Sequence, residues 1–254
     1  MNPLISIITV CYNASDTIER TIRSIDEQTF DDYEHVIVDG ASSDDTLTKV
    51  QAHANSRREV YSDRDEGLYD AMNKGISYSS GRYLIFLNAG DKFHSRDSLA
   101  IIADAINSND TPGIVYGQTV LVDNDGNYIG PRHLTAPDEL NLASFAEGMV
   151  VCHQAFVALR RIAGFYNRKY RYSADYEWCI RCLQHSRKNV GLTDTVLIDY
   201  LSEGLTTRHR RASLWERFRI MSFYYGLFPT IGRHIGFVFR ALKRRRTSNR
   251  NILS

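Results

Sequence analysis

The sequence has few cysteines and no long apolar run. Its four cysteines in 254 residues are too few for a disulfide-built extracellular scaffold. Cys179 and Cys182 have CxxC spacing, but no second Cys or His pair lies at the distance that a zinc finger needs. No segment reaches the roughly 18 apolar residues that cross a bilayer, and the first residues lack the pattern of a signal peptide. We therefore expect a cytoplasmic protein with reduced cysteines.

The net charge of the chain is also small, formally +1 at pH 7. That balance hides a strong asymmetry along the chain. From residue 205 to the end there are twelve Lys or Arg and one acidic residue, Glu216, so this stretch carries +11 and the rest carries −10. An acidic body with a basic tail predicts a negatively charged partner.

The composition, 43% hydrophobic and 24% charged, is ordinary for a globular protein, and the length allows one large core. We find no internal repeat and no low-complexity linker. We therefore expect one continuous domain over residues 1–204, with halves at 1–110 and 111–204, followed by a helical basic tail over 205–254.

Strand-like and helix-like segments alternate in the first half with short links, which predicts an α/β fold with a doubly wound, mostly parallel sheet. Strands are expected at 4–10, 35–39, 59–62 and 82–87, and helices at 15–28, 44–54, 68–78 and 99–107. The second half is mixed α+β, with strands expected at 114–122, 128–129, 151–159 and 196–200 and a helix at 176–185. In the tail we expect two helices, separated where Pro229 breaks the first.

Three apolar strands of the first half end in small or acidic residues, in SIITVCYN, VIVDGASSDD and YLIFLNAGD. The carboxyl ends of parallel strands meet at one edge of a sheet, which is where nucleotides bind. The last carboxylate, Asp91, suits a metal ion. These strand ends predict an enzyme that uses an activated nucleotide compound.

The chain resembles the family 2 glycosyltransferases with the GT-A fold, of the type that acts in bacterial surface-polysaccharide synthesis. The resemblance covers about residues 3–207 and rests on VCYN at 10–13, DGASSDDT at 39–46, YDAMNKGI at 69–76, GRYLIFLNAGD at 81–91 and ADYEWCIR at 174–181. It implies a Rossmann-like sheet, with a nucleotide-sugar half over 1–110 and an acceptor half over 111–204.

By this resemblance Val10, Tyr12 and Asp39 bind the nucleotide. The ring of Tyr12 can stack on a nucleobase, and the Asp39 carboxylate can accept the imide N–H of uracil. The alternatives are a core aromatic at Tyr12 and a helix cap at Asp39.

The family usually has two acidic residues at the strand end where this chain has Asn88-Ala89-Gly90-Asp91. Only the last acid is kept, and the resemblance implies that Asp91 binds Mn²⁺ or Mg²⁺ between the donor phosphates. One protein carboxylate can be enough, because phosphate and water oxygens supply the other ligands. Asn88 is expected to hydrogen-bond the sugar or the ribose.

Asp70, Asn73 and Lys74 lie on one helical turn. The resemblance points this face into the donor crevice, with Lys74 on a phosphate and Asp70 on a sugar hydroxyl. A plain surface ion pair between Asp70 and Lys74 is the alternative.

Asp175 is the candidate catalytic base, with Glu177 as the fallback. The family has an acidic pair here, and this chain keeps only the second acid, after Ala174. A carboxylate can take the proton of an acceptor hydroxyl as its oxygen attacks the anomeric carbon, and this direct attack implies inversion. His153, expected on a strand, resembles the acceptor-side segment, with a structural role as the alternative. Residues 203–207 resemble a loop that closes over the donor.

We therefore expect an inverting, metal-dependent transfer of a sugar from a nucleotide sugar, with UDP as the expected nucleotide, to a hydroxyl of a glycan or lipid-linked glycan acceptor. By family analogy the product belongs to O-antigen, capsule or lipopolysaccharide. The alternatives are a nucleotidyltransferase, whose glycine-rich phosphate loop is missing here, and a catalytically degenerate binding module at the membrane.

Arg and Lys flank aromatic and aliphatic residues throughout the tail, which predicts an amphipathic anchor to anionic lipid at the inner face of the cell membrane. An ordinary solvated pair of helices is the alternative. The acidic body and the lack of a nucleic-acid motif argue against nucleic acid as the partner. The sequence predicts no oligomeric state.

Overall fold

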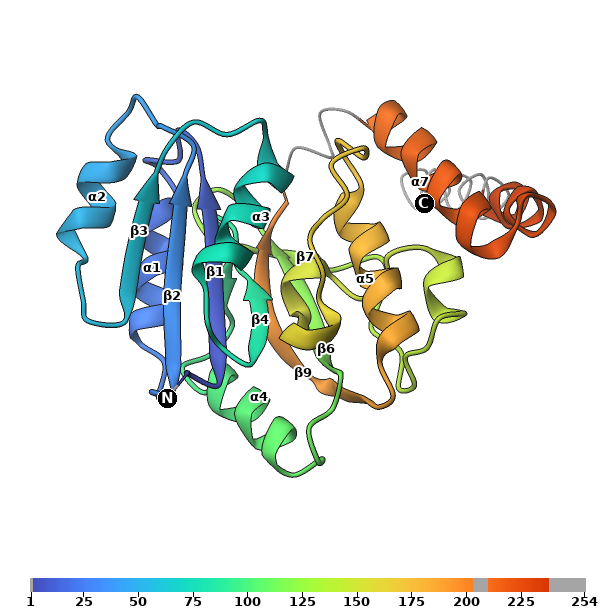
Figure 1. The fold of residues 1–254 in the computed structure, drawn as a ribbon, viewed down its shortest axis with the longest axis horizontal. Helices are drawn as coiled ribbons and strands as arrows, with labels where there is room; N and C mark the ends of the chain where they lie inside the picture. The colour runs from blue at the N-terminus through green and yellow to red at the C-terminus, as the bar shows by residue number, and fades with distance from the viewer. Residues whose placement is uncertain (1, 203–209, 238–254) are drawn as a thin grey trace, which may run out of the picture.

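The computed structural model of this chain describes residues 2–202 and 210–237. One nine-stranded sheet forms its centre, in the order β3-β2-β1-β4-β8-β6-β9-β5, with β7 added to β6 (Figure 1). The strands are β1 (Ile5–Cys11), β2 (Tyr33–Asp39), β3 (Arg58–Ser62), β4 (Tyr83–Phe86), β5 (Lys92–Phe93), β6 (Ile114–Val122), β7 (Tyr128–Pro131), β8 (Phe156–Leu159) and β9 (Asn189–Leu201).

The first four strands in chain order are parallel to one another. The second half is mixed, because β8 runs antiparallel between β4 and β6, whereas β9 is parallel to β6. The predicted α/β class, with a mostly parallel sheet and a mixed second half, is confirmed.

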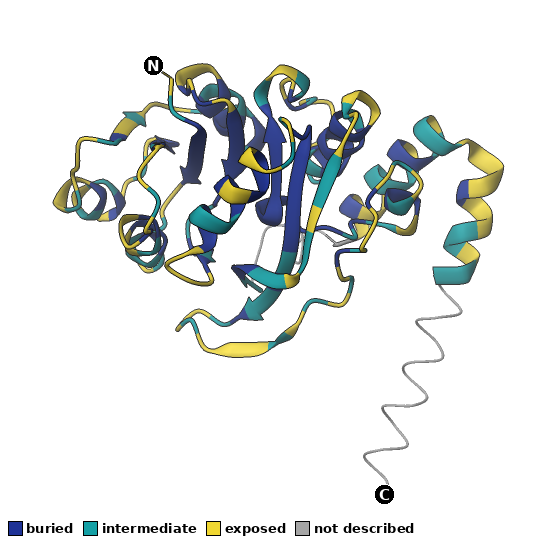
Figure 2. Ribbon diagram, turned by 90° about the horizontal axis from the view of Figure 1, so that it is seen from below, coloured by how far each residue is buried: buried dark blue, intermediate teal, exposed yellow. Residues whose placement is uncertain are grey.

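Helices cover both faces of the sheet, so the core has three layers. They are α1 (Ile18–Asp26), α2 (Thr46–Ala52), α3 (Leu68–Tyr78), α4 (Ser98–Asn107), α5 (Ala174–His185) and α7 (Arg210–Tyr225), with 3₁₀ turns at Ser144–Glu147, His153–Ala155 and Arg160–Ile162. Side chains of α3 and α5 pack on one face of the sheet, and those of α4 and of the end of α1 pack on the other. The central strands between them, β1, β4 and β8, are buried, as the dark blue centre of Figure 2 shows.

Local sequence explains these elements. Every residue of β1 is buried, which is what a central parallel strand covered on both faces requires. In α1, Ile18, Ile22 and Ile25 repeat at helical spacing and are fully buried, so one stripe faces the sheet.

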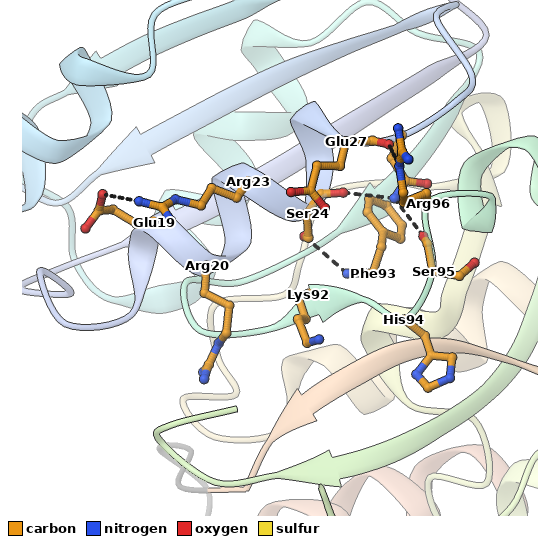
Figure 3. A pocket seen from close by; sticks show the side chains of 11 residues that line it. Glu19, Arg20, Arg23, Ser24, Glu27, Lys92, Phe93, His94, Ser95 and Arg96 are labelled. Carbon is orange, nitrogen blue, oxygen red and sulfur yellow. Dashed lines mark hydrogen bonds and ion pairs between the residues drawn. The ribbon is translucent and has the colours of Figure 1, made fainter. Parts of the chain in front are cut away.

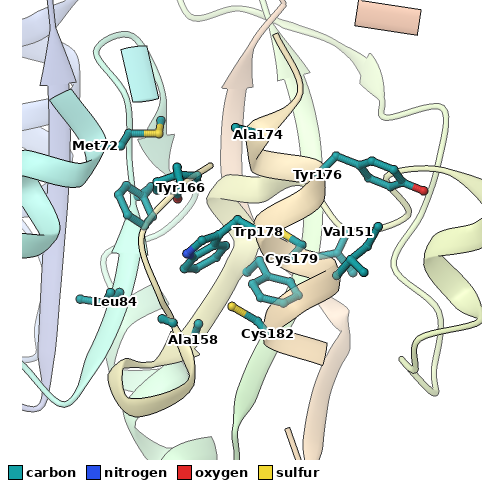
Figure 4. Packing of buried hydrophobic residues seen from close by; sticks show 14 of the residues in the cluster. Met72, Leu84, Val151, Ala158, Tyr166, Ala174, Tyr176, Trp178, Cys179 and Cys182 are labelled. Carbon is teal, nitrogen blue, oxygen red and sulfur yellow. The ribbon is translucent and has the colours of Figure 1, made fainter. Parts of the chain in front are cut away.

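The core under α5 is rich in aromatic side chains, and the two cysteines of the CxxC pair are buried in it. Trp178 is fully buried and stacks on Tyr166 with 5.2 Å between ring centroids. Cys179 and Cys182 lie in the same cluster as free, buried thiols (Figure 4). Within residues 2–202 and 210–237, no group of three or more His, Cys, Asp or Glu side chains is placed to hold a metal.

Two sequence expectations were wrong in detail. The single strand expected at 151–159 is a strand only from Phe156, because His153–Ala155 forms a 3₁₀ turn in which Ala155 N–H donates to the Cys152 carbonyl. Pro229 does not break the tail. The break is at Gly226, with φ +88, and Pro229 lies in the first turn of a helix over 227–237, where its missing N–H is not needed.

The basic tail begins against the body of the protein. Figure 1 shows α7 (red) beside the amino-terminal end of α5, and Ile220 and Met221 belong to the main core cluster. The division of the chain at residue 204 stays a prediction. Among the residues that the structure describes, no helix is both long enough and apolar enough to cross a membrane.

Candidate active site

The carboxyl ends of β1 and β4 open into a cavity of about 380 Å³. Parallel pairing places these strand ends together, since Leu87 N–H donates to the Ile8 carbonyl and Ala89 N–H donates to the Val10 carbonyl. The start of α5 and the end of β9 close the cavity from the second half. It brings together five of the predicted site residues: Val10, Tyr12, Asn88, Asp91 and Asp175.

Asp39 lies behind this cavity, beside Cys11 in the register of β1 and β2. Its carboxylate is fully buried and accepts hydrogen bonds from the Ser42 N–H at 3.0 Å, the Ser42 hydroxyl and the Ser62 hydroxyl at 2.7 Å. It therefore fixes the turn after β2. That turn is bonded to Asn13, whose N–H donates to the Ser42 hydroxyl at 2.8 Å, and the preceding residue, Tyr12, lines the cavity and is 65% exposed.

Asp91 is the buried carboxylate of the cavity, only 3% exposed. Its Oδ1 accepts the Leu201 N–H and its Oδ2 accepts the Gln154 amide N–H, both at 2.9 Å. Burial raises the pKa of Asp91 to about 7, although both hydrogen bonds and the charge of Arg20 act in the opposite direction. A cation nearby would therefore stabilise the ionised form of the carboxylate at this position.

The turn that carries Asp91 is held from α1. Arg20 donates from Nε and Nη2 to the Gly90 carbonyl, at 3.0 and 2.7 Å. Thr21 donates to the Asp91 carbonyl at 2.7 Å and accepts the Gly90 N–H at 2.9 Å. Gly90 has φ +101, a conformation that glycine adopts without strain.

The residues around Asp91 fit a hard divalent cation. Asp91 uses one lone pair on each oxygen, so each oxygen keeps a second one. Asn88 Oδ1 is buried in the same cavity and has no hydrogen-bond partner among the described residues. Two oxygen donors of this kind suit Mn²⁺ or Mg²⁺ when phosphate and water complete the shell.

Asp175 lies in the first turn of α5 and is half-buried. Its Oδ1 accepts the Tyr69 hydroxyl at 3.0 Å and the Tyr176 N–H at 2.9 Å. Within the described ranges, Oδ2 has no protein donor. Glu177 instead binds Arg181 through both carboxylate oxygens at 2.9 Å and accepts the Tyr224 hydroxyl, so the structure places it in an ion pair against α7.

His153 lines the cavity from inside the aromatic core and is 3% exposed. Its Nε2 is 2.6 Å from the Tyr166 hydroxyl, and its buried Nδ1 has no partner in the part of the chain that the structure describes. Burial lowers the pKa of His153 to about 4. The imidazole is therefore neutral. It is a polar member of the core, bonded to the Tyr166 hydroxyl.

Asp70 and Lys74 lie outside the cavity. They face a separate hollow of about 340 Å³ with Arg168, which pairs with Asp70 at 2.9 Å. Lys74 Nζ donates to the Arg64 carbonyl at 2.6 Å. The structure thus does not bring these two residues together with the others, and their contact with donor stays a prediction.

A hollow of about 520 Å³ between α1 and β5 contains none of the predicted site residues (Figure 3). Figure 3 shows Arg20, Lys92 and His94 along one side of it. Each basic side chain already has a protein partner: Lys92 and His94 bind Asp199, Arg23 binds Glu19, and Arg20 and Arg96 bind backbone carbonyls. This arrangement is that of a structural network.

Sequence reasoning missed two cations of the cavity, Arg132 and Arg217. It also missed Tyr69, which donates to Asp175, and it had no role for Gln154, which donates to Asp91. Tyr69 opens the YDAMNKGI segment and Gln154 follows His153, so both lie in segments that carry the resemblance, whereas Arg132 and Arg217 lie in no such segment. The loop expected to close over the donor, 203–207, lies outside the described residues.

Comparisons with known proteins agree with this geometry. Residues 6–164 match the family described as Glycosyl transferase family 2. A PGL/p-HBAD biosynthesis glycosyltransferase of Mycobacterium tuberculosis is 33% identical over 189 residues, which cover 72% of this chain and 71% of that protein.

Two further proteins extend the comparison. The Escherichia coli UDP-Glc:alpha-D-GlcNAc-diphosphoundecaprenol beta-1,3-glucosyltransferase WfgD is 30% identical over 136 residues, 52% of this chain and 53% of that protein. The crystal structure of S. aureus TarS in complex with UDP-GlcNAc shares the fold with a TM-score of 0.76 at 16% identity, over 93% of this chain and 73% of that one.

Proposed function

The chain belongs to glycosyl transferase family 2 and has the GT-A fold, and we propose that it transfers a sugar from a UDP-sugar, with inversion, to a hydroxyl of a lipid-linked glycan. The observation that carries this proposal is the cavity that unites Asp91 with Asp175. One carboxylate faces the nucleotide-binding strand ends, and the other begins α5 in the acceptor half.

Asp175 supplies the base in this proposal. The Tyr69 hydroxyl and the Tyr176 N–H hold its Oδ1, so Oδ2 is left for the acceptor hydroxyl. As the acceptor oxygen forms a bond to the anomeric carbon, the bond from that carbon to the phosphate oxygen breaks. Its electron pair leaves with the nucleoside diphosphate, and the proton moves to Oδ2. Attack opposite the leaving group inverts the anomeric centre.

Asp91 and Asn88 would hold the divalent cation, as Mn²⁺ or Mg²⁺. When bound there, it neutralises negative charge on the departing diphosphate. Leu201 and Gln154 orient the Asp91 carboxylate from the acceptor half. Donor binding would thus depend on contacts made by both halves of the chain.

Tyr12, Val10 and Asp39 form the proposed nucleotide end of the site. Tyr12 is exposed and the backbone of the next residue, Asn13, is fixed by Ser42, so the Tyr12 ring is accessible for stacking on a base. Uracil is the base we propose, since the structure aligned at TM-score 0.76 contains UDP-GlcNAc and the E. coli relative is named for UDP-Glc.

A lipid-linked acceptor fits the relatives and the tail. The E. coli relative is named for a sugar on diphosphoundecaprenol. In this chain, Trp215, Phe223 and Phe228 are 62%, 78% and 83% exposed in a net basic stretch. We propose that these rings insert shallowly into an anionic membrane surface, which would bring the cavity to its acceptor in the synthesis of a bacterial surface glycan.

The direct test is turnover of a set of UDP-sugars with a synthetic lipid-diphosphate-linked monosaccharide, measured as UDP release and as product by mass spectrometry. The coupling constant of the new anomeric proton reports the stereochemistry. Transfer with retention would contradict the proposed mechanism, and absence of transfer or hydrolysis with every donor would contradict the proposed function.

A further inference from the structure

Arg217 is the charged member of an otherwise buried stripe on α7. Ser213, Ile220 and Met221 lie on the same side of the helix at helical spacing and are 2%, 0% and 2% exposed. Tyr224 continues the stripe and donates to Glu177 of α5 at 2.7 Å. A cation among such neighbours is costly unless something compensates its charge.

Specific hydrogen bonds fix α7 at this place. The Glu216 carboxylate accepts the N–H groups of Arg171 and Tyr172, each at 2.8 Å. The Ser173 hydroxyl meets Ser213 one turn before Arg217. These contacts hold α7 against the loop that leads into Asp175, so Arg217 reaches the reaction cavity from the acceptor side.

Among the residues that the structure describes, no carboxylate compensates the charge of Arg217. Its guanidinium lies 5.9 Å from the centre of the Tyr176 ring, and its buried Nε has no acceptor within the described part of the chain. Across residues 2–202 and 210–237, the ion pairs involve other cations and none joins Arg217 to a carboxylate.

Arg132 lines the same cavity and, within residues 2–202 and 210–237, forms no ion pair with a carboxylate. Its guanidinium donates to the carbonyls of Met149, at 2.8 Å, and Leu134, at 3.4 Å, which orient it but leave its positive charge unpaired. Two guanidinium groups that converge on one cavity make a suitable site for phosphate, which they can bind by paired hydrogen bonds.

We infer that Arg132 and Arg217 form a phosphate-binding site inside the cavity and that its ligand is the phosphate of a sugar-phosphate acceptor. This inference rests on the proposed function. Asp175, the proposed base, and Arg217 both line the cavity, and α7 is bonded to the residues that directly precede Asp175. Tyr12 lines the same cavity from the end of β1. An acceptor sugar that carries both a hydroxyl and a phosphate would place the hydroxyl at Asp175 and the phosphate at Arg217.

The diphosphate of the donor is the other phosphate group that these two arginines could bind. The experiment distinguishes it from the phosphate of the acceptor. The variants are Arg217→Gln and Arg217→Lys, with Arg219→Gln as the matched control, since Arg219 is an exposed cation of the same helix. Thermal unfolding of each variant first checks that α7 still packs. Isothermal titration with inorganic pyrophosphate then tests the site without any assumption about turnover.

We expect Arg217→Gln to weaken pyrophosphate at least tenfold, Arg217→Lys to weaken it less, and Arg219→Gln to leave it unchanged. Equal affinity in the wild type and Arg217→Gln would overturn the phosphate site. This outcome is distinct from failure of the proposed function, which would appear as a wild-type enzyme without UDP-sugar turnover.

Kinetics with two acceptors identify the source of the phosphate. One is a sugar linked to a lipid diphosphate, and the other is the alkyl glycoside of the same sugar. We expect Arg217→Gln to raise KM tenfold or more for the diphosphate acceptor, with KM for the alkyl glycoside and for the UDP-sugar unchanged. A rise in the donor KM with both acceptors would overturn the acceptor assignment and give the site to the donor diphosphate.

Discussion

Arg20 donates two hydrogen bonds from α1 to the carbonyl oxygen of Gly90, the residue before Asp91. The same guanidinium donates to the Asn124 carbonyl at 2.9 Å, which ties the β6–β7 turn to the proposed metal-binding turn. Arg20 therefore positions Asp91 through the backbone and lowers the pKa of its carboxyl by charge.

Replacing Arg20 should weaken metal binding without removing a ligand. We expect Arg20→Gln to raise the Mn²⁺ concentration for half-maximal transfer about 10- to 100-fold, the usual effect of losing an outer-shell contact. Arg23→Gln is the control, because Arg23 is an exposed residue of the same helix that pairs with Glu19. An unchanged metal requirement in Arg20→Gln would show that the turn keeps its shape without Arg20.

The pH dependence should follow Asp91. With a pKa of about 7, the carboxyl takes up a proton below neutrality, and the cation must displace it. We therefore expect the apparent metal affinity to fall about tenfold per pH unit below 7. The measurement is a metal titration of UDP binding between pH 5.5 and 8.5. A pH-independent affinity over this range would contradict the assignment of Asp91 as the ligand.

Asp91→Asn should abolish transfer while stabilising the metal-free protein at pH 8. The folded pKa is raised above the unfolded one, so the stability from the protonated carboxyl is present below about pH 4 and is lost as pH rises through about 7. A neutral amide avoids this loss, which amounts to a few kcal/mol at most. Thermal unfolding in EDTA at pH 8 tests it, with exposed Asp104→Asn as the control. A lower melting temperature for Asp91→Asn at pH 8 would contradict the argument.

Asp175→Asn should remove transfer and keep UDP binding. The amide oxygen can still accept the hydrogen bond from Tyr69, so the fold is preserved. The amide cannot take up a proton, so we expect kcat to fall by a factor of about 10²–10⁴. Glu177→Gln is the companion variant. It breaks the ion pair with Arg181, so it should lower the free energy of unfolding and have a smaller effect on the rate of the chemical step. Near wild-type turnover in Asp175→Asn would mean that another group is the base.

Asp39→Ala should weaken UDP by about 1–3 kcal/mol, the cost of losing a hydrogen bond to a charged group. The structure supplies a control, because Asp39 also holds the Ser42 turn and the Ser62 hydroxyl. Ser62→Ala removes one of these bonds and keeps the carboxylate. Calorimetric UDP affinities that fall equally in both variants would assign Asp39 to the turn alone.

The first half of the fold was predictable because its patterns are local. Buried strands such as β1, and the isoleucine stripe of α1, carry their own periodicity, and parallel pairing then places Tyr12 and Asn88 at one sheet edge. The 3₁₀ turn at His153–Ala155 was missed because a short apolar run does not distinguish a strand from a turn buried on all sides. Two-residue β5 is below the length that any pattern can signal.

The two cavity cations were unpredictable for a different reason. Arg217 is one of many basic residues in the tail, and only its tertiary contacts through Glu216 and Ser213 distinguish it from Arg219. Arg132 lies in a stretch of weak periodicity. Sequence thus indicated where the nucleotide end forms, whereas the acceptor side depends on how α5, α7 and residues 131–150 pack together.

The tail prediction concerns the exposed rings beyond that packed stripe. Phe223 and Phe228 are 78% and 83% exposed on either side of Gly226, and the basic run at 243–246, outside the described residues, follows in sequence. We expect binding to anionic vesicles, worth up to about 1 kcal/mol per well-placed basic residue, and weaker binding at high salt because surface charge is screened within about 10 Å.

Co-sedimentation with anionic and neutral vesicles at 50 and 500 mM salt measures this binding. Truncation after Tyr225, the last residue of α7, should release the protein from vesicles and preserve UDP affinity, because the buried stripe with Arg217 remains. Phe223→Ser with Phe228→Ser should reduce binding, whereas Tyr128→Ser, at a ring on β7 that is 65% exposed, should not. Equal partitioning to both vesicle types at both salt concentrations, or none to either, would contradict the anchor, since a basic surface with exposed rings must distinguish the two lipids.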